Sequence, residues 1–214
     1  MKSWSVPCLH KLLLVAVAIC SGVSWASSGT QEGSSSPAAD ETGGAAPAVI
    51  RLQDALLEAM RNHGSRGERE VFLAPVVTAV FDLHNIARIS LGPTWRELGE
   101  PGRADFTARL GILITATYAA RFEADKGLSF QILAVDEAPR GQVVRTRLLR
   151  PPDAPVTLDY FLRDGRIFDV VADGVSDLSL RRADYASIIQ SRGYPALLED
   201  LDASIVKLRS DDEI

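Results

Sequence analysis

The spacing of apolar residues changes twice along this chain, and the order of the changes limits the folds open to it. Over residues 49–120, apolar side chains recur at every third or fourth position, which predicts amphipathic helices. Over residues 128–172 they alternate with polar side chains, which predicts four strands, and Asp164-Gly165 is typical of a hairpin turn. Helical spacing returns over residues 179–208, with a break at Gly193.

This order of elements predicts an α+β fold. Strands that alternate on one side form an antiparallel sheet with one covered face, and the helices before and after it can cover that face. We therefore expect the N-terminal and C-terminal helices to pack on one face of a curved antiparallel sheet of four or more strands. A curved sheet wrapped on helices can leave an apolar pocket between the layers, and we predict such a pocket here.

Local signals place several helix boundaries. Ser65 followed by Glu68 forms the pattern of a capping box at the start of a helix. Pro75 lies inside the pattern that follows, which predicts a kink or a restart. A glycine-rich turn at residues 99–102 is expected to precede the longest helix, and Gly127 is expected to close that helix.

Residues 1–26 are typical of a secretory signal peptide. Lys2 and Lys11 supply its positive charge, residues 12–19 its short apolar segment, and a small-x-small cleavage site ends at Ala26. The apolar segment is shorter than the roughly 20 residues that a membrane-spanning helix needs. We expect cleavage after Ala26. Lipidation of Cys20 is the alternative, which the bulky residue before it disfavours.

The rest of the chain divides into three parts. Residues 27–47 are rich in Ser, Gly, Ala and Pro and cannot bury enough apolar surface to fold, so we predict a disordered linker. Residues 48–209 suffice for one domain with its own core, and residues 210–214 are predicted to form a flexible tail.

Cleavage would change both the thiol content and the charge. Cys8 and Cys20 lie inside the signal peptide, so the mature chain would contain no disulfide and no cysteine nucleophile. Loss of Lys2 and Lys11 leaves 21 basic residues against 28 acidic ones, a net charge of −7 with His neutral. An acidic chain lacks the basic surface expected of a nucleic-acid-binding protein.

The sequence contains no familiar catalytic or nucleotide-binding motif. Neither a P-loop, a G-x-S-x-G elbow, an H-E-x-x-H helix nor a dinucleotide fingerprint is present. His63 and His84 are interpreted as surface or helix-capping residues, because no carboxylate or histidine follows them at ligand spacing. We expect no metal and no cofactor.

One group of polar residues leaves an enzyme open. Asp159, Asp169 and Asp173 could lie near Tyr160 on adjacent strands, an arrangement suited to acid–base catalysis of an isomerase type. The competing interpretation places Asp159 on the outer face of the sheet and Asp173 in a turn. We expect no catalytic residue among them.

The apolar residues on the two layers could fill a core or line a pocket, and composition does not decide between these roles. The set predicted to line a lipid pocket is Val80, Leu91, Leu110, Ile114, Tyr118, Phe122, Val144, Leu148, Leu158, Tyr160, Phe168 and Val170.

Short motifs in a fixed order resemble those of the MlaC-type toluene-tolerance family. They include Phe81-Asp82-Leu83, Trp95-Arg96, Tyr118-Ala119 and Phe168-Asp169-Val170, and the resemblance extends over residues 52–201. It implies a monomeric periplasmic carrier that holds a phospholipid between helices and a curved sheet. Such a carrier moves lipid between the inner and outer membranes, and its partners are an inner-membrane lipid transporter complex and an outer-membrane acceptor.

Some segments depart from the usual family pattern. Arg166-Ile167 and residues 73–76 and 180–185 are more similar to the hopanoid-biosynthesis-associated branch, HpnM, which makes a hopanoid the alternative ligand. Two other classes remain open: a cone-shaped enzyme that binds a small molecule, and an envelope adaptor with no ligand.

Overall fold

A computed structural model describes residues 46–123 and 127–210. The predicted signal peptide and most of the predicted linker lie outside these residues, as does the segment 211–214. The described residues form seven helices and a five-stranded sheet. In chain order the elements are α1 (Ala46–Asn62), α2 (Arg66–Val80), α3 (Leu83–Leu91), α4 (Thr94–Glu97), α5 (Glu100–Arg121), β1 (Ser129–Ala138), β2 (Gly141–Leu149), β3 (Val156–Arg163), β4 (Arg166–Ala172), β5 (Val175–Ser176), α6 (Asp177–Arg192) and α7 (Tyr194–Ser210).

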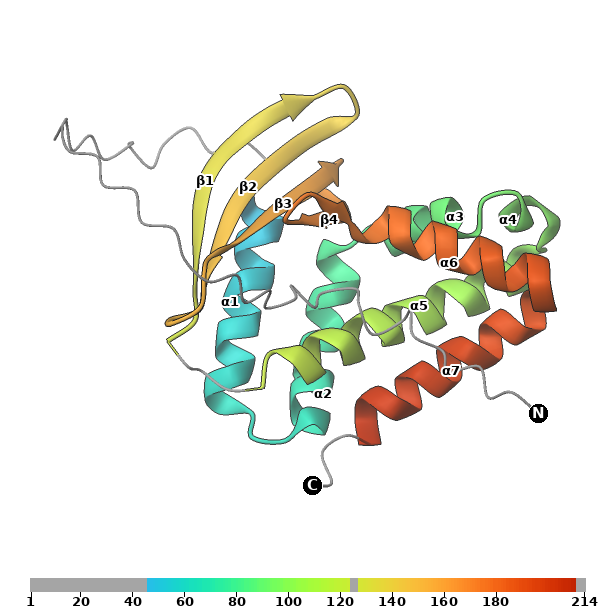
Figure 1. The fold of residues 1–214 in the computed structure, drawn as a ribbon, viewed down its shortest axis with the longest axis horizontal. Helices are drawn as coiled ribbons and strands as arrows, with labels where there is room; N and C mark the ends of the chain where they lie inside the picture. Colours follow the sequence, from blue (N-terminus) through green and yellow to red (C-terminus); the bar gives the residue numbers. More distant parts are fainter. Residues whose placement is uncertain (1–45, 124–126, 211–214) are drawn as a thin grey trace, which may run out of the picture.

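The strands form an antiparallel meander in the order β1-β2-β3-β4-β5, and the sheet curves over the helices (Figure 1). The predicted strands are all present, and β5 is an added strand of two residues. In β1 the register shifts between Ile132 and Ala134, so Ala134 pairs with exposed Arg145 and Val135 pairs with buried Val144, although simple alternation predicts that Ala134 faces inward. The extra residue of such a bulge reverses the side to which the following side chains point.

The helices lie against the covered face of the sheet, with α5 at the centre (Figure 1). Helix α5 packs against α2, α3 and α7, and α6 packs against α3, α7 and β4. Side chains from both layers meet in one core, where Leu52, Phe106, Val144 and Tyr160 are each at most 2% exposed. The predicted α+β fold is confirmed.

Some helix boundaries differ from those predicted. The capping box is present, because the Ser65 hydroxyl accepts from the Glu68 amide and the Glu68 carboxylate accepts from the Ser65 amide. Helix α2 runs through Pro75 without a restart, since buried Leu73 and Val77 hold both of its halves on the core. Pro75 removes only one amide donor from it.

Helix α5 starts earlier and ends earlier than the sequence indicates. Its N-cap is Gly99, so the expected turn at residues 99–102 is its first helical turn, in which Pro101 is tolerated. It ends at Arg121, where the Phe122 amide makes the last bond, to the Tyr118 carbonyl, and Phe122 leaves the helical conformation. Gly127, with φ +74°, lies beyond this end and precedes β1.

One buried arginine joins three segments of the helical layer. Arg69 of α2 is 2% exposed, and its Nε donates to the Ala119 carbonyl of α5 at 2.9 Å. Its Nη1 donates to the carbonyls of His63 and Gly64, just beyond α1, at 3.3 and 2.9 Å. The last turns of α1 and α5 are therefore fixed to the start of α2.

The same end of α2 also holds the end of α7. Arg66 donates to the Leu208 carbonyl, and Arg209 pairs with Glu70. Helices α1, α5 and α7 thus share one attachment point on α2.

Candidate functional site

A cavity lies between β4 and the helices α5, α6 and α7. Its volume is about 1120 Å³ when the open mouth is counted. The wall is formed by Phe81, Ile86, Leu113, Ile114, Thr117, Tyr118, Arg121, Phe122, Phe168, Asp169, Val170, Asp177, Leu178, Arg181, Asp184, Tyr185, Ser204, Lys207 and Leu208. It is a narrow cavity, and most of its wall is apolar.

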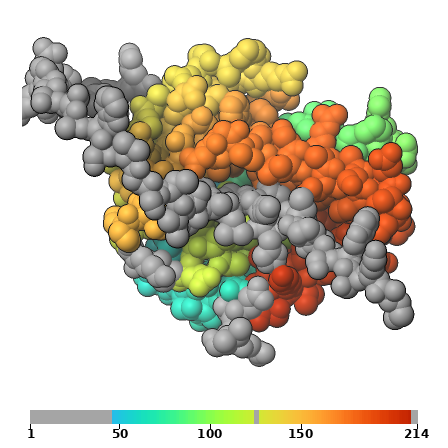
Figure 2. Space-filling view, viewed as in Figure 1, coloured from blue at the N-terminus to red at the C-terminus, as the bar shows by residue number. Residues whose placement is uncertain are grey.

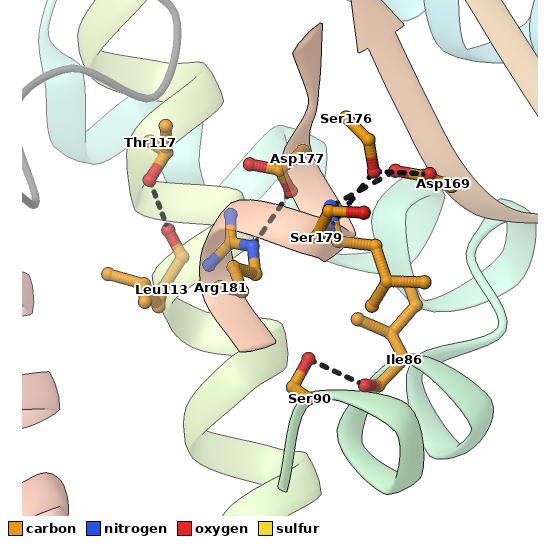
Figure 3. Close-up of polar contacts among 10 residues, drawn as sticks. Ile86, Ser90, Leu113, Thr117, Asp169, Ser176, Asp177, Ser179 and Arg181 are labelled. Carbon is orange, nitrogen blue, oxygen red and sulfur yellow. Dashed lines mark hydrogen bonds and ion pairs between the residues drawn. The ribbon is translucent and has the colours of Figure 1, made fainter. Parts of the chain in front are cut away.

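Helix α5 supplies one side of this wall through side chains spaced three and four residues apart, including Leu113, Thr117 and Tyr118. The Thr117 hydroxyl donates to the Leu113 carbonyl at 2.7 Å (Figure 3). This bond within the helix satisfies the hydroxyl, so the threonine does not require a polar group in the cavity.

A row of aromatic rings continues the apolar wall from α5 towards the sheet. The ring centroids of Phe81 and Tyr118 lie 6.0 Å apart, those of Tyr118 and Phe122 6.0 Å, and those of Phe122 and Phe130 6.2 Å. Burial raises the pKa of Tyr118 well above its usual value, so its hydroxyl stays protonated. The row is neutral and suits contact with hydrocarbon.

Helix α6 brings an ion pair to the opposite side. Arg181 is 8% exposed, and its Nε donates to the Asp177 carboxylate at 2.7 Å (Figure 3). Burial alone would lower the pKa of Arg181, but the nearby Asp177 carboxylate and Tyr185 outweigh it, and the pKa is raised. Both members of the pair therefore remain charged.

Asp169 fixes the start of α6 to β4. Its carboxylate accepts from the Ser176 hydroxyl at 2.6 Å and from the Leu178 amide at 3.0 Å (Figure 3). Burial raises the pKa of Asp169, and these two hydrogen bonds oppose the rise. Its partners are those of a helix cap.

The aspartates considered for catalysis do not converge. Asp159 pairs with Arg145 at 2.9 Å, and Asp173 accepts from the Thr157 amide at 2.9 Å. Within the described residues, none of the three aspartates hydrogen-bonds to Tyr160, which is 2% exposed. Burial raises the pKa of Tyr160 to about 12. Each aspartate thus has a structural partner.

The two histidines considered as metal ligands lie apart, against aromatic rings. The His63 ring lies 4.6 Å from that of Phe72, and the His84 ring lies 5.1 Å from that of Trp95. Residues 46–123 and 127–210 hold no group of three or more His, Cys, Asp or Glu that could bind a metal ion.

The structure divides the residues predicted to line a pocket into two sets. Ile114, Tyr118, Phe122, Phe168 and Val170 line the cavity. The remainder are buried in the core and do not line it: Val80, Leu91, Leu110, Val144, Leu148, Leu158 and Tyr160. These residues fill the space between sheet and helices, whereas the cavity opens beside β4.

Several wall residues were not predicted from the sequence. The helical spacing of α5 could have found Leu113 and Thr117, which share a face with Ile114 and Tyr118. No sequence signal identifies Arg121 and Arg181, because arginine is usually interpreted as a surface residue.

A curved antiparallel sheet packed on helices, with a mostly apolar cavity beside its fourth strand, defines the class of this α+β protein. The chain belongs to the MlaC protein family, which it matches over residues 51–203. The resemblance inferred from the motifs is confirmed for the family.

A solved structure supports the fold. The phospholipid-binding protein from Ralstonia solanacearum, determined in complex with a phospholipid, superposes with a TM-score of 0.68 at 18% identity. The match covers 77% of this chain and 98% of that one. No curated protein matches the sequence. Among the described residues, every helix is too short or too polar to cross a bilayer.

Proposed function

We propose that this protein binds a lipid in the cavity beside β4 and carries it between the membranes of the bacterial envelope. The observation that carries the proposal is the apolar wall formed by α5 and the aromatic rings of Phe81, Tyr118 and Phe122. Membership of the MlaC family and the similarity in fold to a protein solved with a phospholipid support it.

The transfer of hydrocarbon explains why such a cavity suffices without catalytic groups. Each methylene removed from water contributes ~0.8 kcal/mol, so an acyl chain gains stability from apolar contact alone. The polar head would stay at the open mouth, where water solvates it. Among the described residues, the carboxylates considered for catalysis have structural partners, which favours a non-catalytic carrier.

The location, the cargo and the partners that we propose rest on the signal-peptide pattern and on the resemblance to the family. The signal peptide at residues 1–26 would direct the chain to the periplasm, where it would act as a monomer. Its cargo is a phospholipid or, by the resemblance to the HpnM branch, a hopanoid. Its partners would be an inner-membrane lipid transporter complex and an outer-membrane acceptor.

The test is to identify what the protein carries. The full chain would be produced in a bacterium that makes both phospholipids and hopanoids, purified without detergent, and examined by native mass spectrometry and organic extraction. We expect one lipid per protein, and its mass names the cargo. A clean mass without ligand, from cells rich in both lipids, would reject the carrier and favour the envelope adaptor.

A further inference from the structure

Among the described residues, one cation in the cavity wall makes no hydrogen bond or ion pair. Arg121 is the last residue of α5 and lines the cavity. Within residues 46–123 and 127–210 it makes no hydrogen bond or ion pair, and its Nη1 is buried without an acceptor. A buried donor left unsatisfied costs stability, so an arginine in this state calls for an explanation.

The charges around Arg121 do not neutralise it. The carboxylate whose charge favours the protonated form of Arg121 is that of Asp177. Arg181 already engages this carboxylate at 2.7 Å. Burial lowers the pKa of Arg121, and the positive charge of Arg181 lowers it further, while Asp177 and Tyr118 oppose this. Because a guanidinium does not lose its proton in a protein, Arg121 stays positively charged. Its charge is not fully compensated by the groups around it.

The remaining charged groups of the wall are occupied or exposed. Asp169 accepts from Ser176 and Leu178, and Asp184 has a contact of its own. Lys207, on α7, is exposed to solvent. Arg121 is therefore, among the described residues, the partly buried cation of the wall that no carboxylate engages.

We propose that Arg121 binds the phosphodiester of a bound phospholipid and is the residue that makes the cavity prefer a phosphate-bearing head to a neutral one. This inference rests on the proposed function and names the residue that selects its ligand. A guanidinium offers paired donors that match two phosphate oxygens, which an apolar wall cannot do. A hopanoid without an acidic group would leave the cation unsatisfied.

The position of Arg121 suits this role. It follows the apolar residues Leu113, Thr117 and Tyr118 at helical spacing, so one face of α5 runs from hydrocarbon contact to positive charge. The space-filling view shows the yellow-green C-terminal end of α5 reaching the surface between the N-terminal helices and α7 (Figure 2). Acyl chains would lie along α5, and the phosphate would lie at its end.

The experiment compares two lipids that differ only in the phosphate-bearing head. Delipidated full-length protein is titrated with phosphatidylglycerol and with diacylglycerol carrying the same fluorescently labelled chains. We expect the wild type to prefer phosphatidylglycerol by about tenfold or more, as a charge-assisted hydrogen bond allows. R121Q should lose this preference while it binds diacylglycerol as the wild type does.

R147Q is the matched control, because it removes one positive charge from an exposed position of β2 that does not line the cavity. It should keep the preference. R121K, which keeps the charge but lacks the paired donors, should fall between R121Q and the wild type. Since Arg121 makes no hydrogen bond or ion pair within the described residues, R121Q should also melt no lower than the wild type.

The outcomes separate the two claims. If the wild type binds neither lipid, the proposed function fails. If it binds both equally, or if R121Q retains the wild-type preference, lipid binding stands and the role of Arg121 is rejected. If R147Q loses the preference as fully as R121Q, the effect is one of general charge and the assignment to Arg121 is overturned.

Discussion

Thr117 offers the most direct test of where the lipid binds. It lies half-buried on the cavity face of α5, and its hydroxyl donates to the Leu113 carbonyl at 2.7 Å. Replacement by tryptophan would fill the narrow space opposite α6 and remove no contact with other elements. The variant T117W should therefore fold and bind lipid poorly.

The expected magnitude follows from the hydrocarbon that the indole displaces. If it takes the place of about four methylenes, ~3 kcal/mol of transfer free energy is lost at ~0.8 kcal/mol for each. This corresponds to about a hundredfold loss of affinity. Overpacking of a filled site would cost a further ~1–3 kcal/mol of stability, but Thr117 faces empty space, so we expect less.

The chain supplies a matched control on the same helix. Thr107 is also half-buried, and its hydroxyl donates to the Arg103 carbonyl four residues earlier, again at 2.7 Å. It faces a separate groove between α2, α3 and α5. T107W should bind lipid as the wild type does.

Both variants would be compared by circular dichroism, thermal melting and titration with chain-labelled phosphatidylglycerol. A T117W protein that folds and binds with wild-type affinity would show that the cavity beside β4 is not the lipid site. Equal loss in T107W and T117W would point to a general effect on α5, and it would contradict the reasoning equally.

Three further predictions concern the frame around the cavity. R69M should lower the free energy of unfolding by about 3 kcal/mol in urea titrations, because the carbonyls of Ala119, His63 and Gly64 lose their donor. The control R147M, at an exposed position, should change the free energy of unfolding by less than about 0.5 kcal/mol. D177N leaves buried Arg181 without its charged partner, so it should lower the free energy of unfolding by about 2 kcal/mol more than D105N does. D105N is the control, because it breaks a more exposed pair of the same spacing, with Arg109. Equal losses of stability in the two variants would contradict this. Burial raises the folded-state pKa of Asp169 above its usual 3.8, so the fold favours the protonated carboxyl. The stability of the wild type relative to D169N should therefore fall as the pH rises from about 4 towards neutrality. Thermal melts of both proteins at several pH values measure this difference, and a constant difference would reject the prediction.

The sequence predicts the layers of this fold because each depends on local periodicity. The spacing in residues 128–172 fixes which face of each strand is apolar, and the turn at Asp164-Gly165, with φ of 50° and 72°, joins β3 to β4 as expected. The bulge in β1 cannot be seen in that pattern, because Ile132, Leu133, Ala134 and Val135 are all apolar.

The cavity was harder to predict for a physical reason. An apolar residue has the same signature in a filled core and in a cavity wall, so Val144 and Leu148 could not be told apart from Phe168 and Val170. The difference depends on how the helices pack on one another, which contacts distant in sequence decide, such as that of Arg69 in α2 with Ala119 in α5. A charged substitution at Val144 or Leu148 would therefore disrupt the core instead of testing the cavity.

Helices α5 and α7 are both attached to the start of α2, whereas α6 is held to the sheet. Arg69 donates to the last turn of α5, and Arg66 and Arg209 hold the end of α7. Helix α6 is bound to β4 through Asp169 and joins α7 at Gly193, where φ is +87°. If the cavity widens to admit a lipid, we therefore expect α6 to shift relative to α5 and α7, while Arg121 keeps its place at the end of α5.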